Sequence, residues 1–323
     1  MSAIAYRDDI RLNDTKLAIV EQANEIARTY REAGDSLTLR QLYYRFVAAG
    51  LLPNRDQEYK RLGSIINDAR WAGLFDWDYI VDRTRNVRGG DGDDEDPKAV
   101  VEGLSFYAAM WEGQTERVEV WVEKDALIEV VGRACSPLRT PYFSCRGYTS
   151  ASEVKAAAER IEGYFVLGAE HVTVLHLGDH DPSGIDMTRD IEERLDLFLD
   201  GNGYNSDDLE VNRIALNMPQ VRRYNPPPNP AKITDSRAVR YIAEFGRESW
   251  ELDALEPRVL RRLIASEVRA LIDMDEWAKR RAFEAEGQAM LSAFSEHYDR
   301  IHDFLDGEGL LPMTAADAME DES

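Results

Sequence analysis

The sequence has little of what a membrane protein or a cysteine-based metal site requires. Its 323 residues include only two cysteines, Cys135 and Cys145, whose spacing matches no metal-ligand pattern. We therefore expect two reduced thiols. No run approaches the roughly 18 apolar residues needed to cross a membrane, and the first residues contain no apolar signal-peptide core. These absences predict a cytoplasmic protein without a membrane partner.

Positive charge is also scarce. Lys and Arg number 39 against 61 Asp and Glu, so the formal net charge is −22. This balance argues against a nucleic-acid partner unless basic residues gather locally. They do so between Ser36 and Gly90, where nine Lys/Arg and six Asp/Glu give a net charge of +3. Acidic residues concentrate in 91–96 and 317–322, which we interpret as solvated linker and tail. DNA binding would thus be local to the N-terminal part and strongly salt-dependent.

The N-terminal part has the pattern of a small helical domain. Apolar residues at helical spacing predict three helices, over 14–33, 37–49 and 56–72. A strand-like run follows at 76–82. Three short helices and a β element, with a basic balance, are the outline of a winged helix-turn-helix module; a plain helical domain is the alternative. We assign residues 1–90 to this domain and the acidic, glycine-containing segment 91–98 to a linker.

Strand and helix patterns alternate after that segment. We predict strands at 117–122, 142–145, 172–177 and 211–217, with helices at 125–134, 150–163 and 182–199. Such alternation is typical of an α/β fold with a doubly wound, mostly parallel sheet. The region from about 256 to 305 reads as helical. Residues 99–323 are therefore predicted to form one α/β domain with C-terminal helices and an acidic tail.

Two of the predicted strands end in carboxylates. Glu123 follows the first strand, and Asp179 and Asp181 follow the third. Ligands of open α/β sheets bind at the carboxyl ends of strands, and residues i and i+2 of an extended segment point the same way. With no Cys or His set nearby, these acids suit a hard cation such as Mg²⁺. Each acid alone has another explanation: Asp181 before Pro182 is a usual helix N-cap, and Glu123 with Lys124 could be a surface pair.

Two further charged clusters have open interpretations. Glu251 and Asp253 form another acidic i, i+2 pair. A structural ion pair with Arg258 or Arg261 is the favoured interpretation, and a place beside the metal site is the alternative. A basic, proline-rich segment either contacts DNA phosphate or forms a solvated surface; its residues are Arg222, Arg223, Tyr224, Lys232 and Arg237.

The acidic segments resemble a known family. Val122-Glu123-Lys124-Asp125-Ala126 and Gly178-Asp179-His180-Asp181-Pro182-Ser183-Gly184 resemble the Toprim domain of topoisomerases, primases and related nucleases. They are most similar to the A subunit of type IIB topoisomerases (topoisomerase VI) and the related meiotic double-strand-break proteins. Arg146-Gly147-Tyr148 resembles that family's glycine–tyrosine element, and Leu39-Arg40-Gln41-Leu42-Tyr43-Tyr44 its tyrosine-bearing helix. The resemblance covers about 36–217 and implies a winged-helix domain, then a Rossmann-like Toprim domain with a C-terminal helical extension.

The resemblance implies Mg²⁺-dependent DNA cleavage by tyrosine transesterification, with a 5′-phosphotyrosyl product. Tyr44 takes the position of the nucleophile and Arg40, one helical turn before it, that of the supporting cation. Because a phenol has a pKa near 10, nearby positive charge would favour the phenoxide. Tyr43 is the competing residue, interpreted as core; a partly buried aromatic is the structural alternative for Tyr44. Mg²⁺ would be held by Glu123, Asp179 and Asp181.

The implied partners are double-stranded DNA, a second copy of the chain and a separate ATPase subunit. In the family the tyrosine of one protomer meets the Toprim site of the other. The chain has no G-x-x-x-x-G-K-[ST] loop of its own. A DNA role would make the protein nucleoid-associated, and the predicted DNA contacts are Arg45, Arg55, Lys60, Arg61 and Arg70. Two other functions stay open: a Toprim nuclease in which water attacks, and a non-catalytic DNA-binding scaffold.

Overall fold

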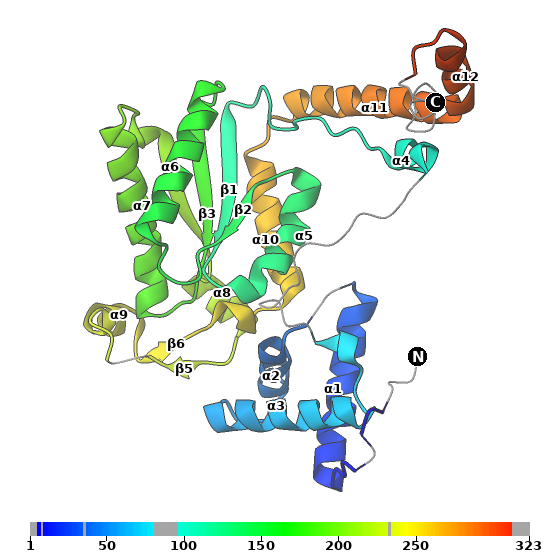
Figure 1. Ribbon diagram of the computed structural model, residues 1–323. Helices are drawn as coiled ribbons and strands as arrows, with labels where there is room; N and C mark the ends of the chain where they lie inside the picture. Colours follow the sequence, from blue (N-terminus) through cyan, green and yellow to red (C-terminus); the bar gives the residue numbers. More distant parts are fainter. Residues whose placement is uncertain (1–4, 8, 35–36, 81–95, 232–233, 312–323) are drawn as a thin grey trace, which may run out of the picture. The chain divides into compact units, whose positions relative to one another are not determined.

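The chain divides into two compact units. The computed structural model describes residues 5–7, 9–34, 37–80, 96–231 and 234–311 (Figure 1). Unit 1 comprises 1–87 and 113–272, and unit 2 comprises 88–112 and 273–323. The boundaries at 90 and 98 stay predictions; within the described residues, Phe106 and Ala108 pack with the C-terminal helices. Most of the predicted linker, 91–98, lies outside the described residues.

Unit 1 begins with three helices, confirming the periodicity of the sequence: α1 (Asp14–Glu32), α2 (Leu39–Ala48) and α3 (Asp56–Trp71). Thr38 and Gln41 form a reciprocal capping box at the start of α2. The turn into α3 is held by Tyr43, whose hydroxyl accepts from Arg55 N–H at 2.7 Å and lies 3.0 Å from the Pro53 carbonyl oxygen. The helices enclose a core of their own, which includes Leu42, Phe46, Leu62, Ile65 and Phe75.

The strand predicted at 76–82 is wrong for the part that can be compared. Residues Trp77–Tyr79 form a short 3₁₀ helix, whose start is capped by the Asp76 side chain. Only Ile80 makes a β-bridge, with Leu37. A local hydrogen bond from Asp78 N–H to the Asp76 carboxylate competes here with β pairing. Residues 81–82 lie outside the described part, so the winged-helix assignment stays a prediction.

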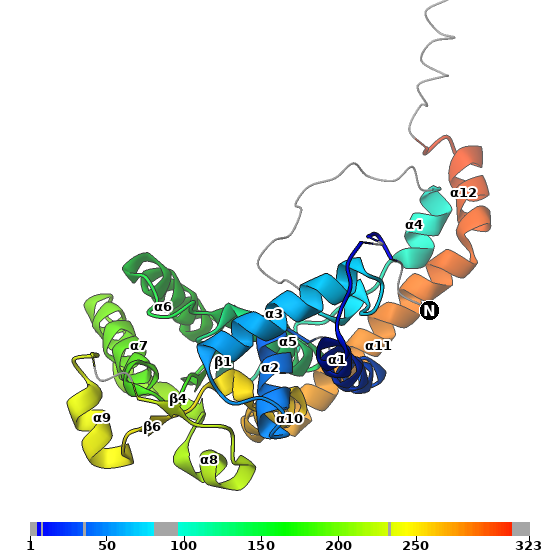
Figure 2. The ribbon, with the colours of Figure 1, turned by 90° about the horizontal axis from the view of Figure 1, so that it is seen from below.

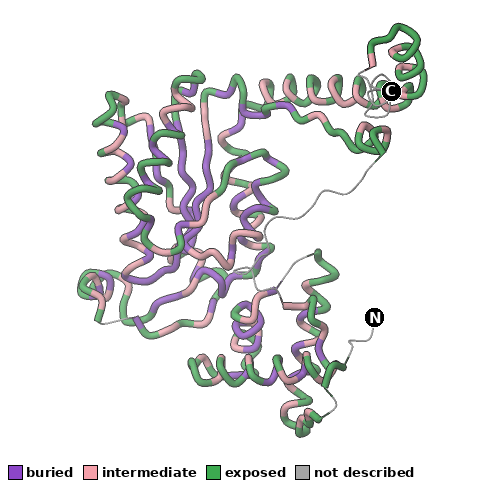
Figure 3. The backbone as a smooth tube through the Cα atoms, in the orientation of Figure 1, coloured by how far each residue is buried: buried purple, intermediate pink, exposed green. Residues whose placement is uncertain are grey.

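The centre of unit 1 is a four-stranded, all-parallel sheet. Its strands are β1 (Glu116–Val122), β2 (Tyr142–Ser144), β3 (His171–Leu177) and β4 (Leu209–Ala215). They lie in the order β2-β1-β3-β4, and β1 pairs with β3 from Glu116↔His171 to Val122↔Leu177. Most residues of β1 and β3 are buried (Figure 3). The mixed α/β fold is compatible with a Rossmann-like domain.

Helices cover both faces of this sheet. The helices α6 (Ala151–Val166) and α7 (Pro182–Gly201) lie on one face, and α5 (Ile128–Cys135) and α10 (Pro257–Ala270) on the other (Figure 1). The chain leaves β1 toward β2 and leaves β3 toward β4, so the strand order reverses between β1 and β3. In doubly wound sheets such a reversal opens a crevice beyond the strand ends. Short 3₁₀ segments complete this part: Asp125–Leu127, Ser136–Leu138 and Ser206–Asp208.

An irregular segment follows β4 and returns to the N-terminal helices. It contains α8 (Met218–Tyr224), β5 (Asn229–Pro230), α9 (Ala238–Phe245), β6 (Glu248–Ser249) and the 3₁₀ segment η5 (Leu252–Ala254). Strands β5 and β6 pair antiparallel. Ala254 of η5 packs into the core of the N-terminal helices. This segment therefore joins the two halves of unit 1.

Unit 2 consists of α4 (Pro97–Gly103), α11 (Met274–Glu296) and α12 (Tyr298–Gly307). The backbone N–H of Phe106 donates to the Gln288 side chain at 2.9 Å, and that of Ala108 to Glu284 at 3.0 Å. Gly287 allows this packing, since a Cβ there would lie 2.3 Å from the Phe106 ring. The helices confirm the helical reading of the C-terminal region.

The two cysteines are buried in unit 1. Cys135 and Cys145 are buried and unpaired, and burial raises the pKa of their thiols to about 12 and about 11. They are therefore poor nucleophiles at neutral pH. In the part of the chain that the structure describes, no helix is both long enough and apolar enough to cross a membrane.

Candidate functional site

Glu123 and Asp179 meet where the strand order reverses. Glu123 directly follows β1, and Asp179 follows β3 after one glycine. The Asp179 backbone N–H donates to Glu123 Oε2 at 2.8 Å. Both side chains are almost buried, and burial raises the pKa of each, that of Asp179 to about 7. Parallel pairing thus brings together two acids that are 56 residues apart in the sequence.

Asp181 caps α7. Its carboxylate accepts from the Gly184 backbone N–H at 2.6 Å and from the Ser183 hydroxyl at 2.9 Å. This is the N-cap arrangement that its place before Pro182 suggested. His180, between the two aspartates, points into an aromatic cluster and lies 2.8 Å from the Tyr241 hydroxyl. Asp179 and Asp181 line one cleft, and His180 is not among its lining residues; a shared ion stays a prediction.

Lys124 forms the centre of the ion-pair network. Its Nζ lies 2.9 Å from Asp179 Oδ1, 2.8 Å from Glu251 Oε2 and 3.1 Å from Asp253 Oδ1. The favoured prediction for Glu251 and Asp253 was a structural pairing with Arg258 or Arg261. The structure corrects it, because these acids bind Lys124 and Arg40, while Arg258 lies near Glu256. The two acids join the site because the Leu252 backbone N–H donates to Asp179 Oδ1 at 2.8 Å.

Tyr44 and Arg40 line the same cleft as the two aspartates. We call this cleft, of about 270 Å³, the acidic cleft; its walls include Arg40, Tyr43, Tyr44, Asn54, Asp179, Asp181, Asn229 and Glu251. The Arg40 guanidinium lies 6.0 Å from the centre of the Tyr44 ring. It pairs with Glu251 and, at 3.3 Å, with Asp253. Four residues proposed from the sequence, Tyr44, Arg40, Asp179 and Asp181, thus line one cleft of one chain. Glu123 is not among its lining residues but contacts Asp179 through the backbone N–H of that residue.

The electrostatics of Tyr44 differ from the expectation. We predicted that Arg40 would favour the phenoxide. Burial, with the negative charges of Asp253 and Glu251, instead raises the pKa of Tyr44 well above its ordinary value. Arg40 lowers it, but the same two acids hold the guanidinium. Tyr44 is also as buried as Tyr43, at 3% and 4% exposed, so burial does not distinguish the two tyrosines.

Arg213 is a site residue that sequence reasoning missed. This β4 residue donates to the carbonyl oxygens of Gly178 at 3.0 Å, Asp179 at 2.6 Å and Gly184 at 2.8 Å. Burial lowers its pKa to about 10. Gly184 packs so closely that a Cβ there would lie 2.2 Å from the Asp179 carbonyl oxygen. No pattern in the sequence singled it out, because β4 also contains Glu210 and Asn212 and reads as an ordinary strand with polar residues on one side.

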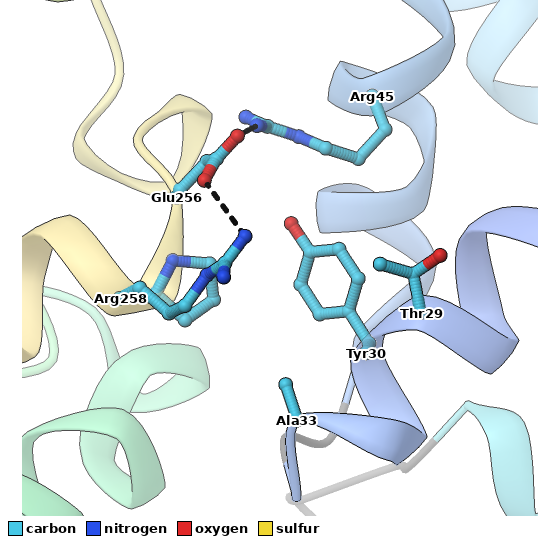
Figure 4. Close-up of a pocket in the computed structure, with 7 residues that line it drawn as sticks. Thr29, Tyr30, Ala33, Arg45, Glu256 and Arg258 are labelled. Carbon is cyan, nitrogen blue, oxygen red and sulfur yellow. Dashed lines mark ion pairs between the residues drawn. The ribbon is translucent and has the colours of Figure 1, made fainter.

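The predicted DNA contacts differ in availability. Arg45 lies in a small cleft with Tyr30 and Arg258, where it pairs with Glu256 at 3.4 Å (Figure 4). Arg70 donates to the carbonyl oxygens of Trp77 and Ile80. Arg61 pairs with Glu58 at 3.0 Å, whereas the side chains of Arg55 and Lys60 are exposed. Two of the five residues are thus held by internal contacts.

The donor chemistry of the site fits a hard cation. The acids Glu123, Asp179, Asp181, Glu251 and Asp253 outnumber the cations Arg40, Lys124 and Arg213 by two. Crowded carboxylates of this kind favour a divalent ion with oxygen ligands. The described residues contain no group of three acidic, His or Cys side chains already placed to ligate a metal. The ammonium of Lys124 instead compensates Asp179, Glu251 and Asp253.

No protein-family model, curated protein or solved structure matches this chain. The resemblance of its motifs to the Toprim and type IIB topoisomerase families therefore rests on the residues named above.

Proposed function

We propose that this chain is a divalent-cation-dependent DNA-cleaving enzyme, similar to the A subunit of type IIB topoisomerases. One observation carries the proposal: Tyr44 and Arg40 line the same cleft as Asp179 and Asp181. A phenol nucleophile, a guanidinium and carboxylates able to hold a cation are the groups that phosphoryl transfer to a tyrosine uses. Their sequence motifs resemble that family's.

The reaction would be a transesterification. The phenolic oxygen of Tyr44 attacks a backbone phosphorus and forms the phosphotyrosyl bond. The bond from phosphorus to the 3′ oxygen breaks, and that oxygen leaves with a proton from water. The phenol proton passes to a carboxylate of the acidic cleft, because the raised pKa of Tyr44 keeps the phenol protonated at neutral pH. Arg40 would neutralise charge on the attacked phosphate.

Glu123, Asp179 and Asp181 are the residues that would hold the cation. A bound Mg²⁺ supplies charge neutralisation for the transferring phosphate and the leaving oxygen. Lys124 and Arg213 hold the same carboxylate loop in place through Asp179 Oδ1 and three backbone carbonyl oxygens.

The arrangement within one chain bears on the partners. In the family, the tyrosine and the Toprim site that work together come from different protomers, and the topoisomerases use a separate ATPase subunit. Here Tyr44 and Asp179 belong to one cleft of one chain. A homodimer and an ATPase subunit are thus proposals from the resemblance, while the residues of the cleft do not require a second copy.

Hydrolysis is the second candidate. It is favoured by the raised pKa and low exposure of Tyr44, both of which disfavour the phenoxide. Water would then attack the phosphorus in place of the phenol, and no protein would be attached to the DNA end.

A plasmid assay separates these functions. Supercoiled DNA is incubated with protein and Mg²⁺, stopped with detergent, and run with and without proteinase treatment. Linear DNA that enters the gel only after proteinase, and that is lost in Tyr44→Phe and in Asp179→Asn, is the expected result. If the protein-linked linear DNA were lost in Tyr43→Phe but not in Tyr44→Phe, the nucleophile would be Tyr43. Cutting that persists in both tyrosine variants would indicate hydrolysis, and no cutting would favour a DNA-binding scaffold.

Cation binding has a test that does not depend on activity. A ligand that binds only the native state raises stability by mass action. We expect Mg²⁺ to raise the Tm of the wild type and to have little effect on Asp179→Asn. An equal rise in both proteins would place the cation elsewhere.

A further inference from the structure

The segment that returns from the sheet to the cleft is basic, in contrast to the rest of the chain. Between Met218 and Ser249 there are six Lys/Arg and three Asp/Glu, a net charge of +3 in a chain of −22. This equals the excess between Ser36 and Gly90 but is concentrated in fewer residues. The segment comprises α8, β5, α9 and β6.

Four arginines of this segment are exposed and form no ion pair within the part of the chain that the structure describes. We call them the arginine surface: Arg222, Arg223, Arg240 and Arg247. None of them forms a salt bridge with a carboxylate of the described residues; Arg223 only lies over the ring of Tyr224, 5.4 Å from its centre. Their charges are thus available to a partner in solution. Arg45 and Arg70 differ from these four arginines, because internal contacts hold their guanidinium groups.

The chain path places the arginine surface beside the acidic cleft. Helix α8 leads through three prolines into β5, and α9 leads through Gly246 and Arg247 into β6. Asn229, Pro230 and Ser249, from these two strands, line the cleft. Figure 2 shows α8 and α9 on either side of β6, as Figure 1 does. The two arginine-bearing helices therefore flank one wall of the cleft.

Contacts to the carboxylate end of the sheet hold α9 in this place. Arg237, just before α9, lies 3.0 Å from Asp186 Oδ2 of α7. The Tyr148 hydroxyl donates to the same oxygen at 2.7 Å and also contacts Arg237. The Gly147 N–H donates to the Glu123 carbonyl oxygen at 3.1 Å. The loop that follows β2 thus connects α9 with the strand end that carries Glu123.

We propose that the arginine surface binds the phosphate backbone of double-stranded DNA on one side of the acidic cleft. The proposal rests on the proposed function, whose substrate it would position. Exposed guanidinium groups bind phosphates and release counterions, so they set affinity and register without reading sequence. It also explains how a chain of −22 could bind DNA: a segment with a net charge of +3 borders the cleft.

The test measures DNA binding without cleavage. The full chain, in EDTA, is titrated against a fluorescently labelled duplex at several salt concentrations. The variant carries Arg222→Ala, Arg223→Ala, Arg240→Ala and Arg247→Ala. We expect the slope of log K against log salt concentration to become shallower by about 3 to 4, since each phosphate contact contributes about 0.9. Affinity at low salt should fall at least about tenfold.

A matched control separates location from net charge. The variant Arg28→Ala, Arg262→Ala, Arg269→Ala and Arg300→Ala removes four exposed arginines from other helices. It should retain the wild-type slope to within about 1. An equal loss of DNA affinity in both variants, or no loss in the arginine-surface variant, would overturn the proposal. So would a wild type that does not bind duplex DNA at low salt. Circular dichroism and Tm check that both variants fold.

The outcomes also separate this proposal from the proposed function. Cleavage by the wild type, with no change of salt slope in the arginine-surface variant, overturns only the binding surface. A reduced slope in a protein that never cuts supports the surface and counts against the enzyme. An acidic competitor without phosphate, such as polyglutamate, should displace the duplex only at much higher charge concentration. Equal displacement would indicate a surface for acidic polypeptide and would contradict the assignment.

Discussion

The acidic cleft and the arginine surface use charge in opposite ways. At the cleft, Glu251 pairs with the largely buried Lys124 at 2.8 Å, and Lys124 also pairs with the buried Asp253 at 3.1 Å. On the arginine surface, the guanidinium groups face solvent without carboxylate partners among the described residues. Buried pairs cost stability when one member is removed, whereas exposed charges mainly act on a partner at a distance. Charge counted along a sequence does not distinguish these roles.

Lys124→Ala should have the largest effect on stability. It leaves Asp179, Glu251 and Asp253 close together without their shared cation. We expect the free energy of unfolding to fall by about 3–5 kcal/mol at neutral pH, measured by urea denaturation. Lys279→Ala, which removes an exposed pair with Glu276 on α11, is the control and should change it by no more than about 0.5 kcal/mol. Similar losses in the two variants would refute the comparison.

A buried neutral histidine gives the next largest effect. Burial lowers the pKa of His176 to about 3, so below pH 6.5 the unfolded state binds a proton that the folded state does not. Stability from this residue is present above pH 6.5 and is lost as the pH falls. Relative to His176→Asn, the wild type should lose about 2 kcal/mol between pH 7 and pH 5. His171→Asn, an exposed position of the same strand, should lose as much unfolding free energy between pH 7 and pH 5 as the wild type does. If the wild type and His176→Asn lost equal amounts, His176 would not be a buried neutral residue.

Within α3, Arg70 and Lys60 should behave differently. Arg70 donates to the carbonyl oxygens of Trp77 at 3.0 Å and of Ile80 at 2.5 Å, and its guanidinium lies 5.3 Å from the centre of the Trp77 ring. Arg70→Ala should lower the free energy of unfolding by about 1–3 kcal/mol. Lys60→Ala, on the exposed side of the same helix, should change it by less than about 0.5 kcal/mol. If Arg70→Ala were neutral, this arginine would be available for DNA after all.

The smallest effect on stability is expected at the arginine surface. Exposed residues without partners contribute little to folding. The variant with all four arginines replaced should unfold within about 1 kcal/mol of the wild type in urea, although its DNA affinity falls. A loss above about 2 kcal/mol would show that these side chains make structural contacts and would weaken the contrast with the cleft.

Local patterns were sufficient for most of the fold. The helices of the N-terminal part and the four strands of the sheet were predicted to within a few residues, because periodicity and capping act over short stretches. The 3₁₀ turn at Trp77–Tyr79 was missed, since a local hydrogen bond from Asp78 N–H to the Asp76 carboxylate outweighed an alternating apolar pattern. The C-terminal helices were predicted, but not that residues 96–112 pack with them.

The sequence by itself determined that Glu123 and Asp179 lie near each other, because both follow strands of one parallel sheet. Only the tertiary structure decided which other charged residues join the ion-pair network around them. Arg40, Lys124, Arg213 and Glu251 come from four different elements, and no periodicity relates residues so far apart. It also decided that Tyr44 is buried beside acids and that Arg45 and Arg70 are held internally. Burial and ion pairing depend on which surfaces pack together, and local sequence does not specify that packing.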